Sequence, residues 1–176
     1  LRGFRGAADS DGATLDRVRA GAGANYAAVR FAGSYIQPFA NGWMATVGLD
    51  GQHAGDPLVP GEQFGLGGAR SVRGFDERHI AGDSGHRVSL EAYTPQGEYG
   101  ELRLKGVGFV DWGELRRNNV QPAEPAVEAV AAWGLGVRAG LTKHVSIVLD
   151  AAKVLRGTAA HAAGSRRIHL SIQMVL

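Results

Sequence analysis

Residues 102–113 read Leu102-Arg103-Leu104-Lys105-Gly106-Val107-Gly108-Phe109-Val110-Asp111-Trp112-Gly113. The alternation predicts a β-strand, because successive side chains of a strand point to opposite faces. One face carries the even-numbered, apolar or small residues, and the other carries Arg103, Lys105 and Asp111. A cation near the middle of a lipid bilayer costs about 2–4 kcal/mol, so the charged face is expected to line a polar interior. We therefore interpret the segment as a membrane-spanning strand.

The same alternation recurs on both sides of this segment. Short turns and long polar connections separate the segments, as on the two sides of bacterial outer-membrane barrels. The pattern predicts an all-β fold, an antiparallel transmembrane β-barrel. An odd number of strands indicates that residues 1–176 form only part of a barrel, because single-chain bacterial barrels have an even number. The seven expected strands are 25–35, 43–52, 87–93, 102–113, 132–141, 145–150 and 167–176.

Composition excludes several other classes of protein. The 176 residues include 27 Gly and no Cys, which removes any disulfide or thiolate-metal framework. No apolar run approaches the roughly 20 residues of a membrane helix. The net charge of +2 is spread without a basic run, so no nucleic-acid partner is expected. The chain starts at Leu1 without a signal sequence, so we expect either an intracellular protein or an internal-to-C-terminal piece of a longer chain. Residues 1–23 read as a strand end followed by a loop.

A long Gly-rich connection, residues 54–85, interrupts the strands. It contains the run Phe64-Gly65-Leu66-Gly67-Gly68 and continues to Phe75. Loops of this length in compact domains are usually functional or disordered, and this one has too many apolar residues for a solvated linker. The glycines lack the Lys-Ser/Thr pair of a phosphate-binding loop, so we interpret them as allowing a tight backbone fold.

Neither catalysis nor metal binding is indicated by local spacing. Asp83, Ser84 and His86 offer an acid, a hydroxyl and a base, but no nucleophile elbow surrounds Ser84. The six His residues are scattered, and no pair has the spacing of a metal site on a helix. The sequence therefore predicts no enzyme, no cofactor and no metal.

The loop resembles the Val-Arg-Gly-Tyr/Phe segment of the outer-membrane transporters of two-partner secretion, the haemolysin secretion/activation family. Residues 108–113 resemble the Phe-x-Asp-x-Gly strand motif of the same family. The resemblance implies that Arg73 of the folded-back loop meets Asp111 on the barrel wall. An Arg fork can donate two parallel hydrogen bonds to a carboxylate, which Lys cannot reproduce. The matching residues are Gly67, Gly68, Ser71, Val72, Arg73, Gly74, Phe75, Gly82, Asp83 and Gly85 in the loop, and Phe109, Asp111 and Gly113 in the strand. Ser89, Leu90, Glu91 and Pro95, which follow the loop, also match, without an assigned role in the site.

The resemblance also implies a function and a location. The chain would be the last part of a barrel of about 16 strands in the outer membrane of a Gram-negative bacterium. It would export a large, unfolded partner exoprotein of haemolysin or adhesin type. Its partners would be that exoprotein, outer-membrane lipid, and the barrel-assembly machinery during insertion. The last strand resembles the recognition strand of such barrels, with Leu176 where an aromatic residue is favoured.

Two alternatives stay open at this point. One is a barrel-assembly or insertion factor of the same superfamily, which shares the Arg-Gly-Phe loop and would carry more periplasmic domains upstream. The other is a soluble β-barrel or sandwich with a binding role. In the soluble protein, Trp43, Trp112 and Trp133 would belong to the core, whereas in a membrane barrel they would lie near the lipid interfaces.

Overall fold

The structure, a computed structural model, describes residues 2–7, 12–23, 25–141 and 144–175. Almost all its regular secondary structure is β. The elements, in chain order, are β1 (Arg2–Ala7), α1 (Gly12–Val18), β2 (Asn25–Pro38), β3 (Met44–Ala54), β4 (Phe64–Leu66), β5 (Ile80–Gly82), β6 (Ser84–Tyr93), β7 (Gly97–Tyr99), β8 (Leu102–Arg116), β9 (Val127–Leu141), β10 (Val145–Arg156) and β11 (Arg166–Met174).

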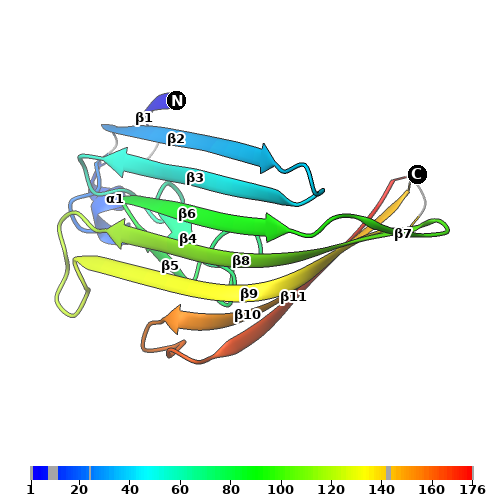
Figure 1. Cartoon of the computed structure of the whole chain (residues 1–176). Helices are drawn as coiled ribbons and strands as arrows, with labels where there is room; N and C mark the ends of the chain where they lie inside the picture. Colours follow the sequence, from blue (N-terminus) through cyan, green and yellow to red (C-terminus); the bar gives the residue numbers. More distant parts are fainter. Residues whose placement is uncertain (1, 8–11, 24, 142–143, 176) are drawn as a thin grey trace.

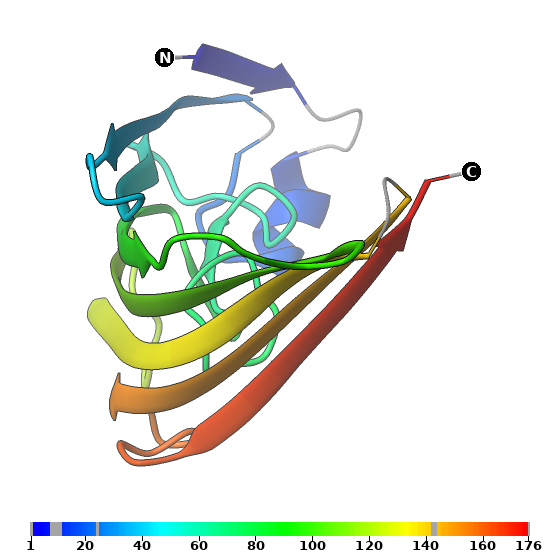
Figure 2. The same cartoon turned by 45° about the vertical axis from the view of Figure 1, so that its right-hand side comes forward.

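One large antiparallel sheet organises the chain. Its strands follow the order β1-β2-β3-β6-β8-β9-β10-β11, and β7 extends it by pairing with β8 (Figure 1). The sheet is strongly curved, and β1 and β11 lie at its two ends in the described part of the chain (Figure 2). Strands β2 and β3, β8 and β9, β9 and β10, and β10 and β11 follow one another directly along the chain. Helix α1 lies between β1 and β2, strands β4 and β5, which pair with each other, lie between β3 and β6, and β7 lies between β6 and β8.

All seven strands expected from alternation are present, so the all-β antiparallel prediction is confirmed. The expectation of a loop through residue 23 is wrong in part. There β1 pairs with β2, from Arg2 opposite Arg30 to Ala7 opposite Asn25, and α1 follows. Strand β1 depends on tertiary pairing, and a helix of seven residues is too short to show a clear periodic pattern. The predicted turn at 142–143 and the terminal Leu176 lie outside the described residues.

The two faces of the sheet differ as the alternation predicted. Val110 points outward and is 45% exposed, whereas the neighbouring Asp111 is 0% exposed. Exposed apolar side chains line the same outer face on the neighbouring strands, including Leu90, Leu135, Val137, Leu149, Leu170 and Ile172. Trp43 and Trp133 are also exposed, which is the reverse of what a soluble module with a tryptophan core requires. No helix in the described ranges is long and apolar enough to span a membrane.

The core lies between the sheet and the segment that connects β3 to β6. Figure 2 shows this segment, with α1, on the inner side of the curved sheet. Its apolar side chains pack against inner residues of β8, β9 and β10. At about 25 cal/mol per Å² of apolar surface, this burial is the main force that holds the segment inside. The cluster consists of Leu66, Val72, Phe75 and Ile80 from the segment and Leu115, Val130, Ala132 and Val154 from the sheet.

Candidate functional site

The inward loop, residues 55–83, folds back on itself before it contacts the inner face of the large sheet, which we call the wall. Strands β4 and β5 pair from Phe64 opposite Gly82 to Leu66 opposite Ile80, which makes a short stem that the sequence pattern did not reveal. Gly67 follows the stem with a φ of +112°, a conformation that other residues rarely adopt. A Cβ at Gly67 would also collide with the backbone oxygen of Asp76. The paired glycines are therefore required by the turn.

Asp83 anchors the base of the inward loop. Its side chain is fully buried and accepts hydrogen bonds from the backbone N–H of Leu58 at 2.8 Å and of Asn118 at 2.7 Å. Arg19, which follows α1, forms an ion pair with it at 3.1 Å. Gln63 Nε2 donates a further hydrogen bond at 3.3 Å. One carboxylate thus connects the loop base to the segment after α1 and to the β8–β9 connection.

Arg73 lies at the tip of the inward loop and meets Asp111 on β8. Its Nε donates to Asp111 Oδ2 at 2.7 Å and its Nη2 donates to Asp111 Oδ1 at 2.8 Å. The backbone N–H of Arg73 also donates to Oδ2, at 3.1 Å. Arg73 is 4% exposed. This is the two-pronged contact that the paired motifs predicted, and it is shielded from water.

The rest of the guanidinium is occupied by neighbouring residues of the wall. Nη1 donates to Glu91 at 2.8 Å, Nη2 contacts the Ser89 hydroxyl at 3.3 Å, and the carbon of the group lies 3.5 Å from the ring centre of Phe109. Burial alone would lower the pKa of Arg73, but the hydrogen bonds and charge of Asp111, followed by those of Glu91, outweigh it and raise the pKa. The group is held as a cation between two carboxylates and an aromatic face.

The residues that flank Arg73 fit the wall closely. Val72 and Phe75 are fully buried in the core cluster. Gly74 has a φ of +97°, and its N–H donates to His169 Nε2 on β11 at 3.1 Å. Gly113, of the strand motif, leaves room for the loop, because a Cβ there would lie 2.7 Å from a methyl group of Leu66.

The remaining loop positions predicted from sequence have backbone or packing roles. The Ser71 hydroxyl accepts a hydrogen bond from the Gly67 N–H at 3.3 Å. Gly68 has a φ of +106°. A Cβ at Gly82 would lie 3.0 Å from the Arg116 carbonyl oxygen, and one at Gly85 would lie 2.5 Å from a Leu115 methyl group. These glycines allow the inward loop and β6 to pack directly against β8.

We call the contact between Arg73 and Asp111 the clamp. A cavity of about 280 Å³, lined largely by polar side chains, lies beside it. Arg138 on β9 pairs with Asp150 on β10 at 2.7 and 3.1 Å, and Asp150 lies 3.9 Å from Arg73. Residues with hydrogen-bonding side chains from the loop and from four strands line the cavity, including Thr46, Ser71, Arg87, Ser89, Glu91 and Arg138. The part of the inner face that borders this cavity is thus rich in polar side chains.

The geometry gives no support to a catalytic triad at 83–86. The Ser84 hydroxyl donates to the Ala54 carbonyl at 3.1 Å, and Asp83 is occupied as described above. The His86 ring packs edge-on against Trp112 at 5.0 Å. Each of the three side chains is used in packing or in backbone contacts.

Sequence reasoning missed several residues of the site: Ser89, Glu91, Asp150 and His169. A signal existed for the first two. Ser89 and Glu91 occupy the polar face of β6, and the register pairs Ser89 with Asp111 and Glu91 with Phe109. Asp150 and His169 come from strands distant in sequence, and only the assembled sheet brings them to Arg73.

Comparison with known proteins identifies the family of the chain. A family model described as "Haemolysin secretion/activation protein ShlB/FhaC/HecB" matches residues 2–139. The chain belongs to the haemolysin secretion/activation family. The match includes both the inward loop and the strand that receives it. No curated protein matches the chain.

Two solved structures share the fold of this family member. CdiB from Escherichia coli superimposes with a TM-score of 0.74 at 20% sequence identity, over 87% of this chain and 28% of that one. CdiB from Acinetobacter baumannii superimposes with a TM-score of 0.68 at 21% identity, over 85% of this chain and 27% of that one. The chain therefore spans less than a third of the length of these two structures.

Proposed function

We propose that this chain is the C-terminal part of an outer-membrane translocation pore that exports a partner exoprotein in two-partner secretion. The observation that carries the proposal is the buried contact between Arg73 and Asp111, which fixes a long loop on the polar inner face of a curved sheet. Family membership supports the same function. The outward apolar side chains suit contact with outer-membrane lipid, and the polar side chains of the inner cavity suit an extended polypeptide.

The proposed activity needs no covalent chemistry. A polypeptide in transit must find hydrogen-bond partners along its path, and the arginines and carboxylates beside the clamp offer both donors and acceptors. The inward loop occupies part of that path. Its contacts with the wall are polar at Arg73 and apolar around Phe75, so releasing the loop requires exposing both kinds of group.

Secretion measured in a reconstituted two-protein system tests the proposal. The complete protein that contains this chain would be expressed in Escherichia coli together with its candidate exoprotein, and the exoprotein would be quantified in the medium and in the periplasm. Export only when the barrel is present is the expected result. Accumulation of the exoprotein in the periplasm despite a normal amount of barrel in the outer membrane would contradict the proposal.

The same cells separate export from barrel insertion. An insertion factor should lower the abundance of unrelated outer-membrane barrels when it is depleted, whereas an exporter should not. The family description names secretion and activation, which favours export.

A further inference from the structure

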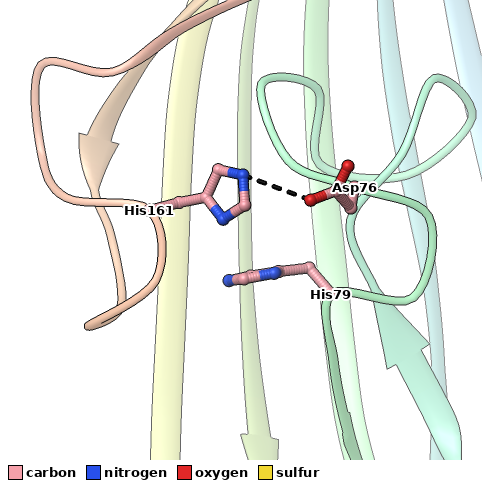
Figure 3. Close-up of side chains that lie close together, drawn as sticks. All are labelled: Asp76, His79 and His161. Atoms are coloured by element: carbon pink, nitrogen blue, oxygen red, sulfur yellow. Dashed lines mark ion pairs between the residues drawn. The ribbon is translucent and has the colours of Figure 1, made fainter.

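A second polar cluster lies where the inward loop meets the β10–β11 connection, residues 157–165. Asp76 and His79 come from the loop, and His161 comes from the connection (Figure 3). Each offers one ligand atom, and the three atoms lie within 4.8 Å of one another. His161 Nε2 is 3.2 Å from an Asp76 carboxylate oxygen.

No protonation state of His161 satisfies all its contacts. Its Nε2 faces both Asp76 and, at 3.3 Å, the Arg167 guanidinium, while its buried Nδ1 has no hydrogen-bond partner. A proton on Nε2 suits Asp76 but opposes Arg167 and leaves the Nδ1 lone pair buried. A proton on Nδ1 suits Arg167 but sets a nitrogen lone pair against the carboxylate. The Nδ1 atom is left without a hydrogen-bond partner, and Nε2 is the atom that lies beside Asp76.

His79 is partly buried, and neighbouring side chains fix its ring. Its Nε2 contacts the Thr158 hydroxyl at 2.7 Å, which orients the ring. Phe75 stacks on His79 with 5.3 Å between ring centres and lies 6.0 Å from His161. Both imidazoles thus lie against the Phe75 ring, and the Asp76 carboxylate is the most exposed of the three groups.

We propose that Asp76, His79 and His161 bind one Zn²⁺ ion and that this ion fastens the inward loop to the β10–β11 connection. Two imidazoles and one carboxylate suit Zn²⁺, with water completing the tetrahedron. Ligands of such an ion lie roughly 3.4 Å apart, so the widest separation in the cluster must shorten by up to about 1.4 Å. Asp76 is 54% exposed and can move by that amount.

When no metal is bound, the Arg167 guanidinium is the cation that pairs with the Asp76 carboxylate. Its Nη1 lies 2.7 Å from Asp76, and its side chain is 35% exposed, so it can swing into solvent when Zn²⁺ binds. The ion and the guanidinium then compete for the same carboxylate. His79 and His161 are far apart in sequence, which explains why spacing along the chain gave no metal signal.

Zinc titration of the complete protein that contains this chain, purified in detergent and stripped with EDTA, tests the site. We expect one Zn²⁺ per chain by calorimetry and by elemental analysis. His161→Ala should weaken binding more than about tenfold. His53→Ala, which removes an exposed His outside the cluster, should leave the affinity unchanged. Absence of saturable binding, or equal affinities in wild type and His161→Ala, would overturn the proposal.

Arg167→Gln gives a second and independent readout. It retains all three ligands and removes the competing cation, so zinc binding should tighten by about fivefold. An unchanged or weaker affinity would overturn the proposal even if His161→Ala failed to assemble. Because binding is measured without any exoprotein, the result does not depend on whether the barrel exports one.

Discussion

At the scale of single residues, the buried guanidinium of Arg73 dominates the site. It makes charge-assisted contacts with Asp111 and Glu91 and lies against the Phe109 ring. The pairing with Asp111 was predicted from two short motifs together with the inward parity of residue 111. Glu91 was not predicted, because only the register between β6 and β8 shows which side chain of β6 reaches the guanidinium.

Arg73→Lys should impair export although the charge is kept. An ammonium group cannot donate both prongs to Asp111 while also reaching Glu91, and each charge-assisted hydrogen bond lost costs about 1.5–3 kcal/mol. Exoprotein in the medium, normalised to barrel abundance, is the measurement. Arg70→Lys is the control, because Arg70 lies in the same loop and its side chain is exposed. Equal secretion by the two variants would tell against a specific clamp.

At the scale of elements, the inward loop is held by its stem, its base and its tip. The strands of the sheet were predictable because their alternation is long and regular. The stem of β4 and β5 was not, since each strand has three residues and pairs only within the loop. Helix α1 was missed for a similar reason, because a helix of seven residues leaves little trace in the sequence.

Gly67→Ala should loosen the inward loop. The added methyl group would require a strained φ and would collide with the backbone of Asp76, at a cost of about 1–3 kcal/mol. Limited proteolysis of the detergent-solubilised protein should then cut residues 67–79 faster. Gly61→Ala is the matched control, because a Cβ at Gly61 would meet nothing within 4 Å. Identical cleavage rates for the two variants would show that the turn tolerates a side chain.

At the scale of the whole molecule, the curved sheet separates an apolar outer face from a polar inner one. Alternation in residues 102–113 predicted this division, and the burial of Asp111 beside the exposed Val110 confirms it for β8. The sequence could not show how much of the inner face of the curved sheet the inward loop covers. That coverage depends on apolar contacts between segments far apart in the chain, such as Phe75 with Val154.

Cysteine labelling tests the orientation of the faces in a membrane. Leu170→Cys and Ser171→Cys are neighbours on β11 that point to opposite faces, and both positions are exposed. In the assembled barrel a membrane-impermeant maleimide should modify the cysteine at 171. It should not modify the cysteine at 170, because lipid covers position 170. Preferential labelling at 170 would reverse the assignment of lipid and lumen.

The central claim is that Arg73 and Asp111 act as one unit that fixes the inward loop to the wall. Removing one partner of a buried pair costs about 3–5 kcal/mol, because the other charge is left without compensation. Arg73→Ala should be the more harmful change, because it removes the cationic partner of both Glu91 and Asp111. Asp111→Ala leaves the contact between Arg73 and Glu91 in place.

The most direct measurement is a double-mutant cycle of Arg73→Ala and Asp111→Ala in the complete protein. Secretion would be normalised to the amount of barrel in the outer membrane, so that failed assembly is not mistaken for failed transport. We expect each single change to impair secretion and the double change to be clearly less harmful than the sum of the two. Additive effects would contradict the clamp.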